Sequence, residues 1–270
     1  MACNHNCSTC KEKCSKPTNL VVNTLEENNI KKIIAVTSGK GGVGKSTVTS
    51  LLAVGLAKKG YKVGILDADI TGPSIPKAFG VEDDVKGNER AMFPPVSKSG
   101  IKVMSVNLLI DEPTKPVLWR GPMINSAVKQ FYSDVLWGDL DFLFVDMPPG
   151  TGDVQMTVFQ SLPIDGTVIV STPQDLVSMI VGKAVNMCKM MDINIIGLIE
   201  NMSYMECPTC SEKLYPFGRS KLEDLSIEYT IKGLCQMPIN PMINELIDLG
   251  AVEEVPVDYL EYALNELINM

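Results

Sequence analysis

Short apolar runs alternate with longer amphipathic stretches over most of this chain. Buried strands are predicted for the runs IIAVTS, KVGILDA, FLFVDM, GTVIVST and IIGLIEN, and a helix is predicted from Lys45 to Lys59. Strands that alternate with helices indicate βαβ units, in which helices cover both faces of a parallel sheet. The expected fold class is therefore α/β, with a mostly parallel sheet flanked by helices on both faces.

The pattern also divides the chain. Residues 1–28 are polar and cysteine-rich without a helix or strand period, so we expect a tail at 1–28 and one domain at 29–270. Between Lys77 and Pro122 the pattern is mixed, and the short strand IKVMSVNLL is expected to lie in an excursion from the sheet. The end of the chain predicts a packed helix with apolar residues at helical spacing: Leu260, Ala263, Leu264 and Leu267.

Charge and composition narrow the function classes. The 270 residues include 24 Lys and Arg against 32 Asp and Glu, a net charge of −8, which argues against broad binding of nucleic acid or anionic lipid. A single histidine, His5, nearly excludes histidine triads and imidazole zinc sites. No run approaches the roughly 18 apolar residues of a membrane span, and the N-terminus lacks a signal-peptide core. We expect a cytoplasmic protein with no membrane or nucleic-acid partner, whose eight cysteines are ligands rather than disulfides.

A phosphate-binding loop follows the first predicted strand. Residues 39–46 fit the pattern G-x-x-x-x-G-K-[ST], and Thr47 continues the loop into a helix. The residues of this loop are Gly39, Lys40, Gly41, Gly42, Val43, Gly44, Lys45, Ser46 and Thr47. Glycines let successive N–H groups turn toward an anion, and the helix N-terminus adds positive potential. We expect Lys45 to reach the β and γ phosphates of ATP and Ser46 to hold Mg²⁺.

The second lysine of the loop, Lys40, lies where an ordinary phosphate loop requires no particular residue. The Lys40 side chain is either a solvated surface group or a group that acts on the nucleotide. The string KGGVGKST resembles the deviant Walker A group of P-loop ATPases, whose extra lysine reaches across a dimer to the partner's nucleotide. This resemblance implies a sandwich homodimer in which Lys40 has a catalytic role beside Lys45.

Two carboxylate motifs are predicted at strand ends, where ligands bind in parallel sheets. Asp146 ends the run FLFV and is expected to hold Mg²⁺ through water, and the loop MPPGTGD after it is suited to sensing a γ phosphate. The motif LDADITGPS contains Asp67 and Asp69, and we choose Asp69 to orient the attacking water. A capping or turn role is the alternative, and it has more weight for Asp67.

The cysteines that have ligand spacing form two groups. Cys207 and Cys210 form a C-x-x-C loop with two thiolates, whereas a tetrahedral zinc or a cubane iron-sulfur cluster needs four ligands. A two-fold dimer supplies the second pair. Ligand chemistry together with the family resemblance given below favours a bridging cluster over structural zinc or a redox pair. For the tail, a second iron-sulfur cluster, zinc and a metal-free redox-sensitive segment all stay open. Its cysteines are Cys3, Cys7, Cys10 and Cys14.

Five motifs together resemble one family. KGGVGKST, DADITGPS, VDMPPGTGD, ENMS and CPTC, in this order over about residues 30 to 270, resemble the Mrp/ApbC family of iron-sulfur cluster carrier ATPases. The resemblance implies a homodimer that binds and slowly hydrolyses ATP with Mg²⁺ and holds a [4Fe-4S] cluster between its Cys207/Cys210 pairs. It implies an upstream cluster donor and recipient apo-proteins, with Asn201 and the segment around Pro238 at the adenine. The tail is similar in kind to the cluster motif of the eukaryotic cytosolic scaffold branch, but more compact.

Two rival functions stay open at this point. A spatial-positioning ATPase of the MinD or ParA type shares the loop and the dimer but binds membrane or DNA. Here no Lys or Arg follows Lys232, so anionic lipid would repel the acidic terminal segment. An ATP-driven electron donor similar to nitrogenase iron protein also bridges a cluster, but with ligands from separate loops. The cluster carrier is the expected function, and the positioning ATPase is the alternative.

Overall fold

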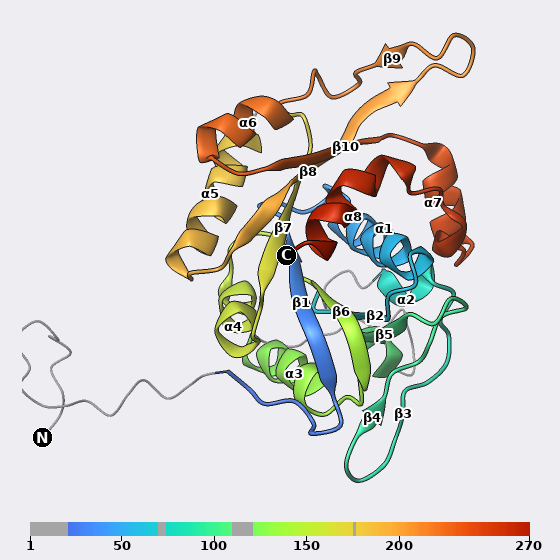
Figure 1. Ribbon diagram of the computed structural model, residues 1–270, viewed down its shortest axis with the longest axis vertical. Coiled ribbons are helices and arrows are strands. Elements are labelled where there is room, and N and C mark those ends of the chain that lie inside the picture. The colour runs from blue at the N-terminus through green and yellow to red at the C-terminus, as the bar shows by residue number, and fades with distance from the viewer. Residues whose placement is uncertain (1–20, 70–73, 110–120, 175–176) are drawn as a thin grey trace, which may run out of the picture.

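A sheet runs through the middle of the protein, and helices pack on both of its faces (Figure 1). The structure is a computed structural model that describes residues 21–69, 74–109, 121–174 and 177–270. Within these ranges the main sheet has eight strands, with β9 (Lys213–Leu214) paired to β8 at its side. The other strands, in their order across the sheet, are β10 (Gly233–Pro238), β8 (Ile195–Glu206), β7 (Gly166–Ser171), β1 (Asn29–Thr37), β6 (Asp139–Asp146), β2 (Val63–Asp67) and β5 (Lys102–Ser105).

The pairings of this sheet are parallel, except that β9 runs antiparallel to β8. The predicted α/β class is therefore confirmed. In the central strand β1, Ile34 and Val36 pack in the core on one face, whereas Ile33 and Ala35 pack in the core on the other. Side chains of a strand alternate between faces, so a strand that is covered on both faces is continuously apolar.

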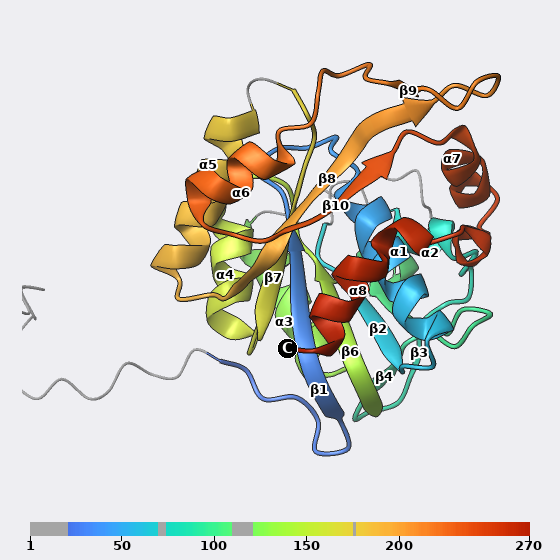
Figure 2. The same cartoon turned by 45° about the horizontal axis from the view of Figure 1, so that its top comes forward.

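The helices divide between the two faces (Figure 2). One face is covered by α1 (Lys45–Lys58), α2 (Ile75–Ala78), α7 (Pro241–Asp248) and α8 (Glu261–Ile268). The other is covered by α3 (Gly121–Ser133), α4 (Asp153–Ser161), α5 (Val177–Met190) and α6 (Leu222–Tyr229). Shorter described elements are η1 (Val106–Leu109), η2 (Val252–Glu254), η3 (Asp258–Leu260) and a hairpin of β3 (Lys86–Gly87) and β4 (Met92–Phe93). None of the described helices is long and apolar enough to cross a membrane.

The strand expected outside the sheet is in fact part of it. β5 pairs in parallel with β2 and forms one edge, so the expectation of an excursion for IKVMSVNLL is wrong. Val103 and Met104 are fully buried and face opposite cores. Among the described residues between Lys77 and Pro122, the β3–β4 hairpin does leave the main sheet.

The predicted terminal helix is confirmed as α8, in which Ala263, Leu264 and Leu267 are buried, while Leu260 is buried in η3 just before it. Helix α8 packs against α1 at a close contact between Leu264 and Gly55. A Cβ atom at position 55 would lie 2.6 Å from Leu264 Cδ1. Gly55, in the last turn of α1, therefore allows α8 to approach the helix that follows the phosphate loop.

Replacing Leu264 with Ala is expected to lower the free energy of unfolding by about 3 kcal/mol, because it leaves a cavity under α8. Gly55→Ala should also destabilise the protein, although Ala favours a helix by about 1 kcal/mol over Gly. In the Leu264→Ala background the added methyl has room, so Gly55→Ala should become stabilising. Urea unfolding measures these effects, with exposed Leu249→Ala as control. Additive effects of the two substitutions would contradict the packing.

Candidate functional site

The carboxyl ends of β1, β2 and β6 meet at one edge of the sheet. The strand register places Asp67, the last residue of β2, beside Asp146, the last residue of β6. The phosphate loop leaves the adjacent end of β1 and enters α1. A pocket of about 250 Å³ lies here, lined by the loop together with Asp69, Ser74 and Pro149. The topology thus brings motifs that are far apart in sequence to the usual ligand edge of a parallel sheet.

Glycine is required inside the phosphate loop. Gly42 and Gly44 both have φ of +77°, a left-handed conformation that side chains disfavour. At Gly44 the space is also closed, because a Cβ atom would lie 2.2 Å from Asn201 Nδ2. Val43 between them is buried and anchors the loop to the core.

Lys45 and Asp146 form the charged centre of the site. Lys45 Nζ donates to Asp146 Oδ2 at 2.7 Å and lies 3.6 Å from Asp69 Oδ2. Ser46 Oγ donates to the same oxygen of Asp146, and Thr49 Oγ1 donates to the other, each at 2.6 Å. Asp146 is fully buried, so these three donors replace the water that its carboxylate loses on folding.

Thr49 is a site residue that the sequence analysis missed. It lies one helical turn after Lys45, and residues at this spacing share one face of a helix. The helical spacing from Lys45 could have identified Thr49, which lies beyond the phosphate-loop motif that ends at Ser46.

Asp67 combines a turn contact with deep burial. Its Oδ1 accepts the N–H of Asp69 at 3.1 Å, as in an Asx turn, and its Oδ2 accepts Ser105 Oγ at 3.0 Å. Its exposed fraction is only 1%. Burial raises the pKa of the Asp67 carboxyl to about 8, and the negative charge of Asp146 acts in the same direction.

The loop predicted to sense the γ phosphate runs beside the phosphate loop. Gly150 N donates to Ser38 O at 2.9 Å, and Pro149 lines the shared pocket. Lys40 Nζ donates to Gln174 Oε1 of the same chain at 2.5 Å. Its reach to a partner's nucleotide therefore stays a prediction.

The two residues expected at the adenine lie in different surroundings. Asn201 is nearly buried and donates from Nδ2 to Val43 O of the phosphate loop at 2.9 Å. Pro238 ends β10 opposite Tyr204 and lines a groove of about 690 Å³ with Tyr259. Asn201 is not among the residues that line this groove, and its place at the adenine stays a prediction.

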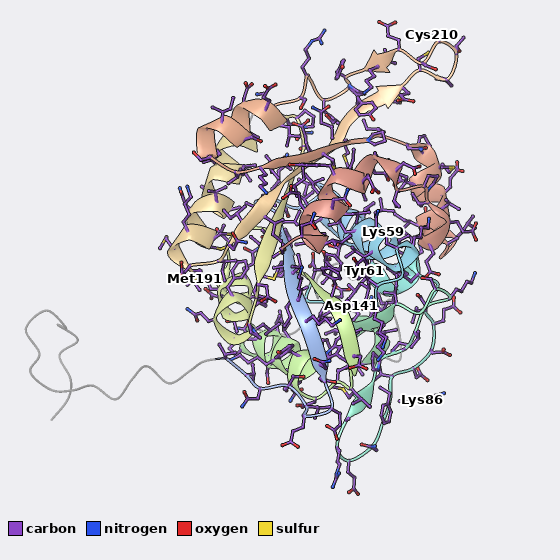
Figure 3. All side chains as sticks on the ribbon, in the orientation of Figure 1. Lys59, Tyr61, Lys86, Asp141, Met191 and Cys210 are labelled. Atoms are coloured by element: carbon purple, nitrogen blue, oxygen red, sulfur yellow. The ribbon has the colours of Figure 1, made fainter. Side chains whose placement is uncertain are left out.

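Cys207 and Cys210 lie on the hairpin that β8 and β9 extend away from the body, and Figure 3 shows Cys210 near its far end. The connection is a turn rather than a helix start, because the described residues 207–212 form no helix and Cys207 N donates to Glu212 O across the hairpin at 2.9 Å. Cys207 is half-buried and Cys210 is exposed. The backbone N–H groups of Thr209 and Cys210 donate to the Cys207 sulfur and lower its pKa, which favours the metal-binding thiolate.

The remaining cysteines differ from this pair. Burial raises the pKa of Cys188 to about 11 and that of Cys235 to about 12, so both stay thiols near neutral pH. Within the described residues, no three His, Cys, Asp or Glu side chains gather as a metal site. The predicted tail ligands lie outside the described residues: Cys3, Cys7, Cys10 and Cys14.

Comparison with known proteins identifies the family. The family model ParA, described as NUBPL iron-transfer P-loop NTPase, matches residues 29–269. The chain belongs to this family. A relative named iron-sulfur cluster carrier protein, from Clostridium perfringens strain 13, is 44% identical over 276 residues, which cover 96% of this chain and 97% of the relative. The resemblance to cluster carriers that the motifs indicated is thereby confirmed at the level of the family.

Solved structures agree with this membership. A nucleotide-binding protein from Archaeoglobus fulgidus, in complex with ADP and with cobalt found, is 45% identical and superposes with a TM-score of 0.77, covering 86% of this chain and 91% of that one. The MinC:MinD complex of Aquifex aeolicus gives a TM-score of 0.65 at 22% identity, covering 88% of this chain and 96% of that one. The second likeness shows a shared fold alone.

Replacing Asp67 with Asn is expected to remove a pH dependence of stability. A carboxyl whose pKa rises on folding from 3.8 to about 8 keeps its proton in the folded state and loses it on unfolding between these values. The free energy of unfolding should therefore fall as the pH rises through this window, by at most about 1.4 kcal/mol per pH unit. Urea unfolding across the window compares wild type with Asp67→Asn and with exposed Asp139→Asn as control. Equal slopes in wild type and Asp67→Asn would contradict the burial argument.

Proposed function

We propose that the protein is an ATP-dependent iron-sulfur cluster carrier, which holds a [4Fe-4S] cluster between two copies of the chain and passes it to apo-proteins. The observation that carries the proposal is the C-x-x-C hairpin, which continues the same strand that contacts the phosphate loop. A relative that matches nearly the whole chain is named an iron-sulfur cluster carrier protein, and this supports the proposal. The likeness to MinD concerns the fold alone, so the positioning alternative is less supported.

The cluster is the cargo of the proposed reaction, and Cys207 with Cys210 are its ligands. One hairpin offers two thiolates, whereas a cubane cluster takes four, so two hairpins related by a two-fold axis complete the set. The exposed position of Cys210 and the lowered pKa of Cys207 suit a site that binds metal and exchanges it at the surface.

The phosphate loop is the ATP site of this proposal. A bound phosphate would compete with Asp146 for Lys45, and Asp146 and Ser46 would then present oxygen atoms to a cation. Oxygen donors of this kind fit Mg²⁺, which neutralises phosphate charge when it is bound. Asp69 lies beside Lys45 on the pocket wall, and we assign it to orienting the attacking water.

The proposal includes several further parts. Lys40 acts across the homodimer, and Asn201 with the segment around Pro238 holds the adenine. The domain is residues 29–270, and the tail at 1–28 is a second metal-binding segment. A cluster donor acts upstream, and a reducing cytoplasm keeps the two thiols of the hairpin reduced.

Iron-sulfide reconstitution under anaerobic conditions tests the cluster site. A full-length protein in which the four tail cysteines are Ser should bind about four irons per dimer. Adding Cys207→Ser and Cys210→Ser should remove this iron and its sulfide, whereas Cys235→Ser should retain them because Cys235 lies on β10, outside the hairpin. Iron and sulfide analysis with native mass gives the result. Zinc instead of iron at the hairpin would sink the carrier proposal.

Asp69→Asn tests the role assigned to this carboxylate. The variant should bind ATP with unchanged affinity, because Lys45 and the loop amides remain, but hydrolyse it about 100-fold more slowly. Phosphate release under saturating ATP measures the rate, and exposed Asp139→Asn is the control. Hydrolysis at the wild-type rate would show that another group orients the water.

A further inference from the structure

β8 joins the phosphate loop to the cysteine hairpin. It begins as a parallel strand between β7 and β10, and its last residues, Met205 and Glu206, pair antiparallel with β9. Cys207 follows directly. One strand therefore passes from the buried sheet into the hairpin that projects from the body (Figure 2).

β8 is irregular at the point where it passes the phosphate loop. From Glu200 to Tyr204 it advances four residues while its partner β10 advances two. Met202 within this segment has φ of +55°, a left-handed conformation that is uncommon for a residue with a side chain. Asn201 Oδ1 accepts the N–H of Met202 at 2.9 Å and so supports this conformation. Such a bulge changes the direction of a strand.

The bulge is joined to the phosphate loop through one side chain. Asn201 donates to Val43 O, and the same Nδ2 atom fills the space that a Cβ atom at Gly44 would need. A backbone shift at these two loop positions must therefore move Asn201 or break its hydrogen bond.

Glu200, next to Asn201, holds both ends of the hairpin segment. Its exposed fraction is 0%, and its Oε2 accepts Ser203 Oγ at 2.6 Å while its Oε1 accepts Lys221 N at 2.9 Å. Ser203 lies where the hairpin segment leaves the sheet, and Lys221 lies where it returns into α6. We call Glu200, Ser203 and Lys221 the clamp. Hydrogen bonds to a buried carboxylate are strong, so the clamp fixes the base of an otherwise exposed segment.

We propose that Glu200 and Ser203 are positioning residues that transmit the nucleotide state of the phosphate loop, through Asn201, to the geometry and exposure of Cys207 and Cys210. This inference rests on the proposed function, which makes the loop the ATP site and the hairpin the cluster site. When the phosphate loop moves, Asn201 moves with it, because Asn201 is hydrogen-bonded to Val43. The clamp ties the base of the hairpin to Glu200, the neighbour of Asn201. A displacement of the phosphate loop therefore also displaces Cys207 and Cys210, because the base of the hairpin is fixed and does not bend independently.

Residue-resolved alkylation of the full-length apo-protein with N-ethylmaleimide, followed by mass spectrometry, measures the effect at Cys207 and Cys210. In wild type, a saturating non-hydrolysable ATP analogue should change their labelling rates by about threefold or more. Ser203→Ala removes one hydrogen bond of the clamp, so the two rates should become nearly independent of nucleotide. Ser203→Thr keeps the hydroxyl and should restore the nucleotide effect.

Ser97→Ala is the matched control, because Ser97 Oγ donates to another carboxylate, that of Glu253, at the same distance of 2.6 Å. It should keep the nucleotide effect. Ser203→Ala should stay folded at the temperature of the labelling experiment and keep wild-type affinity for the analogue, which separates lost transmission from unfolding.

Two results would overturn the inference. One is a full nucleotide effect in both Ser203→Ala and Glu200→Gln. The other is a wild-type protein that binds a cluster at the hairpin but shows no nucleotide effect on its thiols, and in that case the proposed function stands. A wild-type protein that binds no cluster at the hairpin would instead remove the proposed function.

Discussion

The buried carboxylate of Asp146 is the constraint on which the site depends. Removing such a group from water costs several kcal/mol unless donors surround it. Lys45, Ser46 and Thr49 provide those donors, and all three belong to the start of α1. Their hydrogen bonds hold the helix and the phosphate loop against the end of β6. The same atoms are the ones that would meet phosphate and a cation, so the contact that stabilises the fold also prepares the proposed ATP site.

The second constraint is that β8 forms part of both the central sheet and the cysteine hairpin. Its buried part completes the sheet, and its end forms the hairpin with Cys207 and Cys210. A strand can do both only if its direction changes, and the bulge at Met202 makes that change where Asn201 reaches the phosphate loop. Nucleotide and cluster are thus proposed to bind at two places along one strand, which explains how a carrier could couple them.

The sequence predicted the parts of the site that local spacing determines. Lys45 and Ser46 lie in one loop motif, and the apolar run before Asp146 places this residue at a strand end. The structure brings these three residues together as expected. The edge strand β5 was placed wrongly because its four residues carry too little pattern to show which strand they pair with.

Residues whose contacts depend on register between distant segments were beyond the sequence. Glu200 contacts Lys221, which is 21 residues away, and Asp67 becomes buried only when β2 pairs with β5 and β6. Neither contact produces a periodic pattern of apolar and polar residues in the sequence. The tail cysteines lie outside the described residues, and their ligand role stays a prediction.

The proposed function requires that the cluster moves from this protein to a recipient. Its most direct test mixes the reconstituted protein with an apo-protein that requires a [4Fe-4S] cluster, in the presence of an iron chelator, and follows the recipient's activity. The recipient should gain its cluster faster than from free iron and sulfide, and the chelator should not prevent it. Transfer no faster than from free iron and sulfide, and abolished by the chelator, would contradict the proposed function.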